Sequence, residues 1–127
     1  MKKILVAEDD KDIRELVVFS LRFGGYNVVE ASDGEEVLRI APLEKPDLII
    51  LDVRMPRMTG YKACEKLRDI PETSNIPIVF LSARGQERDV QQGMKLGAKE
   101  YILKPFAPDE LLRRVESILA ANQSRES

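Results

Sequence analysis

The stretch that decides the fold is ILVAEDD, at residues 4–10. Four apolar residues run without alternation into three acids, and two similar runs follow, LIIL at residues 48–51 and IPIVFL at residues 76–81. Short continuous apolar runs are typical of strands that are covered on both faces of a sheet. Weaker strand patterns occupy residues 26–30 and 100–103. The sequence therefore predicts five strands, three of them fully buried.

Helical patterns lie between these strands. Apolar residues recur at helical spacing after the first strand and near the end of the chain: Ile13, Leu16, Val17 and Leu21, then Leu111, Leu112, Val115, Ile118 and Leu119. Asp10 or Asp12 can cap the first helix. A weaker helix is expected over about residues 86–96, with Gly93 as a destabilising residue and Gly97 as a left-handed cap. Strands that alternate with helices predict an α/β fold, a doubly wound parallel sheet of five strands with five helices.

Length and charge restrict the class of protein. The 127 residues fit one domain, expected over residues 1–121, followed by a polar tail or the start of a linker at residues 122–127. Lys and Arg total 20 against 22 Asp and Glu, a balance that argues against a surface built to coat nucleic acid or an anionic membrane. No apolar segment approaches the roughly 18 residues of a membrane helix. We therefore expect a soluble, cytoplasmic domain that binds neither nucleic acid nor membrane directly.

The chain has no histidine and a single cysteine, Cys64. Without histidine it can have no Ser-His or Cys-His catalysis, no imidazole metal ligand and no phosphohistidine of its own. One cysteine makes neither an internal disulfide nor a zinc cluster, and it fits a reducing compartment. Cys64 is expected to be a small core residue.

Polar residues follow the predicted strands at the point where each one ends. The acids of residues 8–10 follow the first strand, Asp52 ends the third, Ser82 follows the fourth and Lys104 the fifth. Ligands of open parallel sheets bind beyond the carboxyl ends of the strands. We therefore expect carboxylates from two strands to converge there, beside a hydroxyl and an ammonium.

Such a cluster has a definite chemistry. Converging carboxylates repel one another unless a cation or a proton intervenes. Because no histidine is available, the ligands are all oxygen, which favours Mg²⁺ and next Mn²⁺. Ser82 and Lys104 can bind phosphoryl oxygens, and an aspartate can attack phosphorus to form an acyl phosphate. Asp52 is the natural nucleophile, since Glu8 and Asp9 are adjacent and suit metal binding.

Five motifs in order resemble the receiver domain of bacterial two-component response regulators (CheY-like), over about residues 2–120. They are ILVAEDD at 4–10, LIILDVRMP at 48–56 with Gly60, FLSA at 80–83, Gly97-Ala98, and YILKPF at 101–106. The resemblance implies a flavodoxin-like fold with strand order 2-1-3-4-5.

The resemblance also implies a role for the residues of the acidic cluster. Asp52 would be the phosphoacceptor. Asp9 would bind Mg²⁺ directly and Glu8 through water, with Asp52 and the backbone carbonyl of Arg54 as further ligands. Asp10 is expected to cap a helix and not to bind metal.

The remaining site residues follow from the same resemblance. Ser82 would be the switch hydroxyl, and Lys104 would pair with the phosphate and precede a cis peptide to Pro105. Tyr101 would be the aromatic side chain that turns inward on activation. Family positions that influence the lifetime of the phosphoryl group are occupied by Arg54 and Arg84.

The function implied is a phosphorylation-controlled switch that assists only its own phosphorylation and dephosphorylation. A sensor histidine kinase or a histidine phosphotransfer protein would supply the phosphoryl group. The fourth helix, fifth strand and fifth helix would carry the signal to an output domain or a downstream protein. Receivers that dimerise through that face carry a set of charged residues, which Glu100, Glu110 and Arg114 resemble and from which Val90 and Lys99 depart.

Two other functions remain open from the residues alone. A phosphohydrolase of the haloacid-dehalogenase type also uses an aspartate nucleophile, but it needs a second acid two residues later, where this chain has Arg54. A pseudo-receiver would bind partners without phosphorylation, yet Glu8, Asp9, Asp52, Ser82 and Lys104 are all in place. Neither glycine-rich nucleotide motif occurs.

Overall fold

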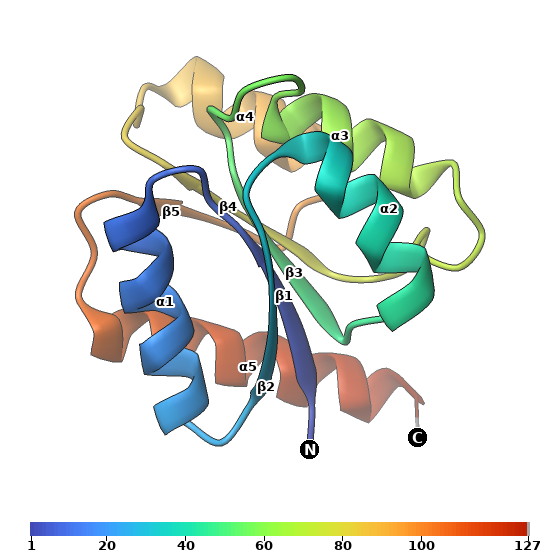
Figure 1. Cartoon of the computed structure of the whole chain (residues 1–127), viewed down its shortest axis with the longest axis vertical. Helices are drawn as coiled ribbons and strands as arrows, with labels where there is room; N and C mark the ends of the chain where they lie inside the picture. The colour runs from blue at the N-terminus through green and yellow to red at the C-terminus, as the bar shows by residue number, and fades with distance from the viewer. Residues whose placement is uncertain (127) are drawn as a thin grey trace.

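Five strands and five helices alternate along residues 1–126, the part of the chain that the computed structural model describes (Figure 1). The strands are β1 (Lys3–Ala7), β2 (Asn27–Ala31), β3 (Leu48–Asp52), β4 (Ile78–Ser82) and β5 (Glu100–Leu103). The helices are α1 (Lys11–Phe23), α2 (Gly34–Glu44), α3 (Gly60–Arg68), α4 (Glu87–Lys95) and α5 (Pro108–Glu126). The predicted order of elements is confirmed.

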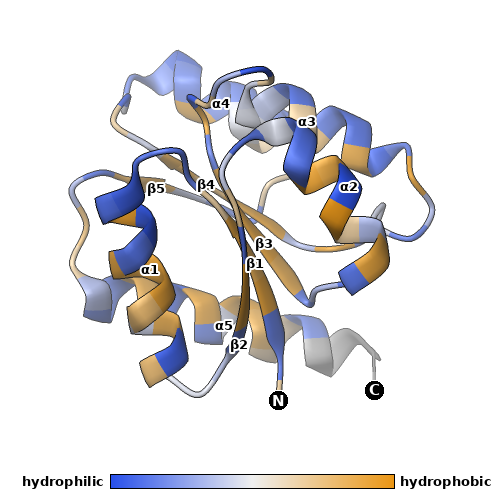
Figure 2. Ribbon diagram, in the orientation of Figure 1, coloured by the Kyte–Doolittle hydropathy of each residue, from blue (hydrophilic) through white to orange (hydrophobic). Residues whose placement is uncertain are grey.

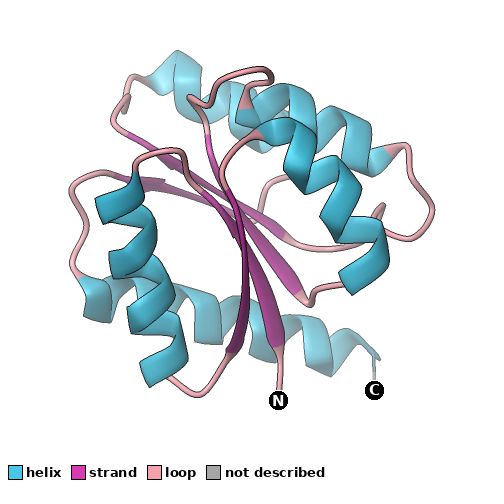
Figure 3. Cartoon of the chain, viewed as in Figure 1, coloured by secondary structure: helices cyan, strands magenta, loops and turns pink. Residues whose placement is uncertain are grey.

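All the strands are parallel and form one sheet in the order β2-β1-β3-β4-β5. β1 lies between β2 and β3 and pairs with both: Leu5 lies opposite Val29 of β2 and Ile49 of β3. Helices cover both faces of the sheet (Figure 3). The predicted doubly wound, flavodoxin-like architecture is therefore confirmed.

The sheet separates two hydrophobic cores. α1 and α5 lie on one face, and α2, α3 and α4 on the other (Figure 1). Along β1, Ile4 and Val6 contribute to the first core, and Leu5 and Ala7 to the second. The middle strands of the sheet are mainly apolar, while the helices alternate apolar and polar residues along their length (Figure 2). Burial on both faces explains why β1, β3 and β4 appear in the sequence as apolar runs, whereas the edge strands β2 and β5 are only partly buried.

Two helix boundaries matter for the site. Asp10 caps α1, since its carboxylate accepts hydrogen bonds from the backbone N–H groups of Asp12 (3.0 Å) and Ile13 (3.1 Å). The weaker helix expected over residues 86–96 is α4, followed by Gly97 at φ +90°. A Cβ atom on Gly93 of α4 would lie 3.0 Å from both Phe80 and Tyr101, so this glycine allows α4 to approach the sheet closely.

The end of the chain differs in part from the expectation. α5 continues to Glu126, so helical backbone runs through most of the segment expected as a polar tail or linker, residues 122–127. Ser127 lies outside the described residues, and the domain boundary at residue 121 stays a prediction. Within the described part of the chain, no helix has the length and apolar character needed to cross a bilayer.

Candidate functional site

The carboxyl edge of the sheet carries a hollow of about 380 Å³. β1 delivers Glu8 and Asp9 to it, β3 ends there in Asp52, β4 ends in Ser82, and β5 is followed by Lys104. The residues that line the hollow are Glu8, Asp9, Asp10, Ile13, Asp52, Arg54, Ser82, Ala83, Arg84 and Lys104. Every predicted site residue except Tyr101 therefore lies at this hollow.

Three carboxylates meet in the hollow. Glu8, Asp9 and Asp52 each present one oxygen, and these oxygens all lie within 4.8 Å of one another. Glu8 is fully buried and Asp52 is 4 % exposed, whereas Asp9 is open to solvent. Ligand oxygens on opposite sides of one Mg²⁺ are about 4.2 Å apart. The three acids thus need only a small adjustment to bind a single ion.

Lys104 is the cation that faces these acids. Its Nζ donates a hydrogen bond to Asp52 Oδ1 at 3.1 Å and lies 2.6 Å from Glu8 Oε1. Glu8 Oε1 is fully buried, and the Lys104 ammonium is its ion-pair partner. The other oxygen of Glu8 accepts from the backbone N–H of Asp10 at 3.2 Å.

The ionisation of the site follows from burial. Burial raises the pKa of Asp52 from 3.8 to about 8, and the adjacent Glu8 acts in the same direction while Lys104 opposes it. Burial alone would lower the pKa of Lys104, but the contacts with Glu8 and Asp52 outweigh it and leave that pKa raised. Lys104 therefore stays protonated at neutral pH, while Asp52 readily holds a proton unless a cation besides Lys104 binds beside it.

Backbone donors complete the hollow. The N–H of Arg54 donates to Asp52 Oδ1 at 3.4 Å, and the N–H of Arg84 donates to Ser82 Oγ at 3.0 Å. A hydroxyl oxygen that accepts one hydrogen bond can still donate its own hydrogen. Ser82 can therefore donate toward a group bound beside Asp52.

Two loop features position Asp52 and Lys104. A Cβ atom on Gly60 would collide with the backbone carbonyl of Asp52, so only glycine allows α3 to begin against the end of β3. The peptide between Lys104 and Pro105 is cis, as the resemblance implied. Arg57, which follows the β3 motif, pairs with Asp33 outside the cluster of Glu8, Asp9 and Asp52: its Nη1 donates to Asp33 Oδ2 at 2.6 Å.

Tyr101 lies in an adjoining pocket of about 220 Å³, which shares Arg54, Ser82 and Arg84 with the hollow. Its hydroxyl donates to the carbonyl of Arg84 at 3.0 Å and lies 3.2 Å from the hydroxyl of Tyr61. Sequence reasoning missed Tyr61. Its place directly after Gly60, next to the β3 motif, was the available signal.

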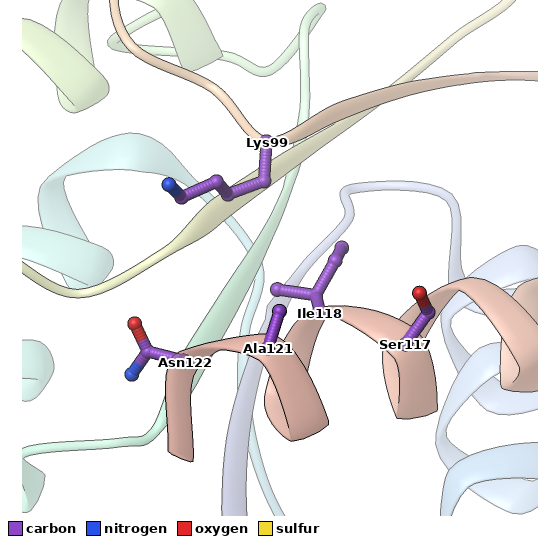
Figure 4. Close-up of a pocket in the computed structure, with 5 residues that line it drawn as sticks. All are labelled: Lys99, Ser117, Ile118, Ala121 and Asn122. Atoms are coloured by element: carbon purple, nitrogen blue, oxygen red, sulfur yellow. The ribbon is translucent and has the colours of Figure 1, made fainter. Parts of the chain in front are cut away.

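A separate pocket of about 210 Å³ lies between Lys99 and the C-terminal half of α5 (Figure 4). Because Lys99 directly precedes β5, this pocket is at the amino edge of the sheet, away from the acids. Its lining, Lys99, Ser117, Ile118, Ala121 and Asn122, includes one ammonium and no carboxylate. It offers none of the chemistry of the acidic hollow.

Comparison with known proteins agrees with this geometry. The model of the response regulator receiver domain family matches residues 4–116. The chain belongs to this family. A curated relative, "Probable transcriptional regulator ycf27" of Cyanophora paradoxa, is 46% identical over 123 residues, which cover 97% of this chain and 50% of the relative.

A second relative of this receiver domain is the "Alkaline phosphatase synthesis transcriptional regulatory protein PhoP" of Bacillus subtilis. It is 44% identical over 122 residues, which are 96% of this chain and 50% of that protein. The chain therefore spans about half the length of these curated relatives. Both relatives are named as transcriptional regulators.

Among solved structures, the receiver domain of the sensor histidine kinase PA1611 from Pseudomonas aeruginosa PAO1 superimposes with a TM-score of 0.87 at 29% identity, covering 94% of this chain and 98% of that one. That structure is described as having a magnesium ion coordinated in its active site cleft. In the present chain, Glu8, Asp9 and Asp52 form a cluster of carboxylates close enough together to hold a metal ion.

Proposed function

We propose that this receiver domain is a phosphorylation-controlled switch in which Asp52 accepts a phosphoryl group from a histidine kinase or a histidine phosphotransfer protein. One observation carries the proposal. Asp52 is almost fully buried at the carboxyl edge of the sheet, with Lys104 Nζ at 3.1 Å and two further carboxylates within 4.8 Å. Phosphoryl transfer depends mainly on such positioning and charge neutralisation.

The residues present fit a hard divalent cation, Mg²⁺ or else Mn²⁺. Three carboxylates offer oxygens within 4.8 Å of one another, a single lysine faces two of them, and all the metal ligands they offer are oxygens. Asp9, Asp52 and the backbone carbonyl of Arg54 would hold the ion directly, and Glu8 would hold it through water. When bound, Mg²⁺ supplies positive charge that neutralises the carboxylates and the incoming phosphoryl oxygens.

The chain's own residues perform the transfer. An oxygen of the ionised Asp52 carboxylate forms the new bond to phosphorus as the P–N bond to the donor imidazole breaks. The imidazole leaves with the electron pair and takes up a proton. Lys104 moves from its two carboxylates to a phosphoryl oxygen, and Ser82 donates its hydroxyl hydrogen to another.

A movement of Ser82 toward the phosphoryl group can be passed on to the surface formed by α4, β5 and α5. Ser82 and Arg84 are linked by a hydrogen bond, and Arg84 O accepts from Tyr101 (3.0 Å for each bond), so a shift of Ser82 reaches α4 and β5. We expect α4, β5 and α5 to engage an output domain or a downstream protein. Within the chain, Arg114 on this surface already pairs with Glu100 and Glu110.

We expect no turnover of an external substrate, because the phosphoryl group ends on the protein itself. The position two residues after Asp52, where a phosphohydrolase would need an acid, is Arg54. A pseudo-receiver, in contrast, would not acquire phosphate at all.

The test is incubation with acetyl phosphate and Mg²⁺, followed by intact-mass measurement. The wild-type chain is expected to gain the mass of one phosphoryl group, and the Asp52→Asn variant none. Asp69→Asn, which changes an exposed acid at the end of α3, is the matched control and should behave as wild type. Equal phosphorylation of Asp52→Asn would overturn the assignment.

A further inference from the structure

Two phenols join three elements beside the proposed site. The hydroxyls of Tyr61 on α3 and Tyr101 on β5 lie 3.2 Å apart. The Tyr61 hydroxyl also donates to the carbonyl of Asp89 in α4 at 3.0 Å. The Tyr101 hydroxyl donates to the carbonyl of Arg84, in the loop before α4, at the same distance.

These contacts cannot all be hydrogen bonds at the same time. Each phenol carries one hydrogen, so two hydrogens serve the contact between the phenols and two carbonyls. If Tyr61 donates to Tyr101, Tyr101 donates to Arg84 and the carbonyl of Asp89 loses its phenol donor. If Tyr101 donates to Tyr61, Tyr61 donates to Asp89 and the carbonyl of Arg84 loses its donor. The pair therefore has two alternative arrangements of similar chemistry.

The rings of Tyr61 and Tyr101 are held in place by packing, whichever way their hydroxyl hydrogens point. Tyr61 meets Phe80 edge to face, with ring centroids 5.0 Å apart at 80°. Phe80 is fully buried, and its centroid lies 6.3 Å from that of Tyr101. Gly93 of α4 packs directly against these rings, because a Cβ atom there would lie 3.0 Å from both Phe80 and Tyr101. The hydroxyl of Tyr61 is thus held 3.2 Å from the Tyr101 hydroxyl while the latter reaches the carbonyl of Arg84.

The ionisation of Tyr61 favours this role. Burial raises the pKa of Tyr61, and the contacts with Tyr101 act in the same direction. The phenol is therefore neutral at physiological pH and keeps the hydrogen that it donates.

We propose that Tyr61 is a positioning residue for the switch, whose hydroxyl holds Tyr101 turned toward the carbonyl of Arg84 and so ties α3 and α4 to β5 before any phosphoryl group arrives. This inference rests on the proposed function, since it treats Tyr101 as the switch aromatic. It implies that phosphorylation of Asp52 needs to supply less free energy to turn Tyr101 inward than it would without the Tyr61 hydroxyl, because the contact with Tyr61 already favours that position.

The experiment compares wild type with Tyr61→Phe, which removes one oxygen and keeps the ring against Phe80. Signals of isotope-labelled tyrosine are followed by NMR, without and with beryllofluoride and Mg²⁺. In Tyr61→Phe the Tyr101 signal is expected to move away from its wild-type position even without beryllofluoride. The apparent affinity for beryllofluoride is expected to fall about two- to ten-fold, the equivalent of one hydrogen bond. Unchanged Tyr101 signals would overturn the inference.

Tyr26→Phe is the matched control, since Tyr26 packs against the core on the opposite face of the sheet and should leave both readouts unchanged. A double-mutant cycle adds a second criterion. If the two phenols are coupled, the effects of Tyr61→Phe and Tyr101→Phe on beryllofluoride affinity are non-additive, whereas additive effects contradict the inference. Failure of the wild-type chain to bind beryllofluoride would instead count against the proposed function, and the beryllofluoride-free Tyr101 signal would still decide the role of Tyr61.

Discussion

The ammonium of Lys104 lies 2.6 Å from Glu8 Oε1, an oxygen on a side chain with no exposed surface. The same ammonium reaches Asp52 at 3.1 Å, so one lysine contacts both buried acids. In the proposed reaction it must leave them for a phosphoryl oxygen. The structure of the resting site and the chemistry of transfer therefore depend on the same nitrogen.

Replacing this counter-ion should destabilise the fold. Lys104→Met leaves the buried Glu8 without its cation beside a largely protonated Asp52, which should lower the free energy of unfolding by about 3 kcal/mol in EDTA at neutral pH. Mg²⁺ should recover much of the loss, since it binds the same oxygens. Denaturant unfolding with and without Mg²⁺ measures both effects. Lys99→Met, at an exposed lysine, should match wild type, and equal stability of the Lys104 variant in EDTA would contradict the account.

A divalent cation should stabilise the wild-type chain. Mg²⁺ that binds only the folded state raises the unfolding temperature progressively with its concentration. In Asp9→Asn most of this increase should disappear, because one of the three clustered carboxylates is lost. Asp10→Asn is the control: asparagine caps a helix as well as aspartate does, so the response to Mg²⁺ should persist. A full response in Asp9→Asn would remove Asp9 from the metal site.

Acid should weaken the cap of α2. Asp33 accepts from the backbone N–H of Glu36 (2.9 Å) and from Arg57 (2.6 Å), and these contacts, the first above all, hold its pKa below the usual 3.8. A carboxyl group whose pKa is lower in the folded than in the unfolded protein stabilises the fold at pH values above its unfolded-state pKa. That stabilisation is lost as the pH falls through the folded-state pKa. Asp33→Asn keeps the cap but cannot ionise.

The expected difference in unfolding free energy between wild type and Asp33→Asn is less than about 1 kcal/mol at neutral pH, because Arg57 is largely exposed. It should shrink as the pH falls below the ordinary pKa of 3.8 and vanish below the lowered pKa of the folded state, as followed by denaturant titration on acidification. A difference that grows on acidification would have the wrong sign.

Gly93 is predicted to resist replacement by alanine. In most helix interiors Gly→Ala stabilises by up to about 1 kcal/mol. Here the added methyl group would meet Phe80 and Tyr101 at 3.0 Å, so we expect a net loss of about 1–2 kcal/mol. Arg88→Ala, at an exposed position of α4, should change stability by less than about 0.5 kcal/mol. Thermal unfolding measures both, and a stabilised Gly93→Ala variant would show that the contact is easily relieved.

Much of the fold could be predicted because each buried strand is an unbroken apolar run. The site was predictable for a related reason. A polar residue directly after a parallel strand lies at the carboxyl edge whatever the rest of the chain does, and this placed Glu8, Asp52, Ser82 and Lys104 together.

Contacts between distant segments were not predictable in this way. Tyr61 and Tyr101 are 40 residues apart, and their hydroxyls meet only because α3 and β5 both pack against Phe80. Gly93 appeared in the sequence as a weak point of a helix, whereas in the fold it permits close packing. The extent of α5 was also underestimated, since a polar segment can continue a helix whose apolar face is already anchored upstream.

The central claim is that Asp52 carries the phosphoryl group, and residue-level mapping tests it most directly. After treatment with acetyl phosphate and Mg²⁺, borohydride reduces an aspartyl phosphate to homoserine, which peptide mass spectrometry locates. The account predicts homoserine at position 52 and at no other acid. Reduction products at residues 8 or 9, or at none of the acids of a chain that has gained phosphate, would contradict it.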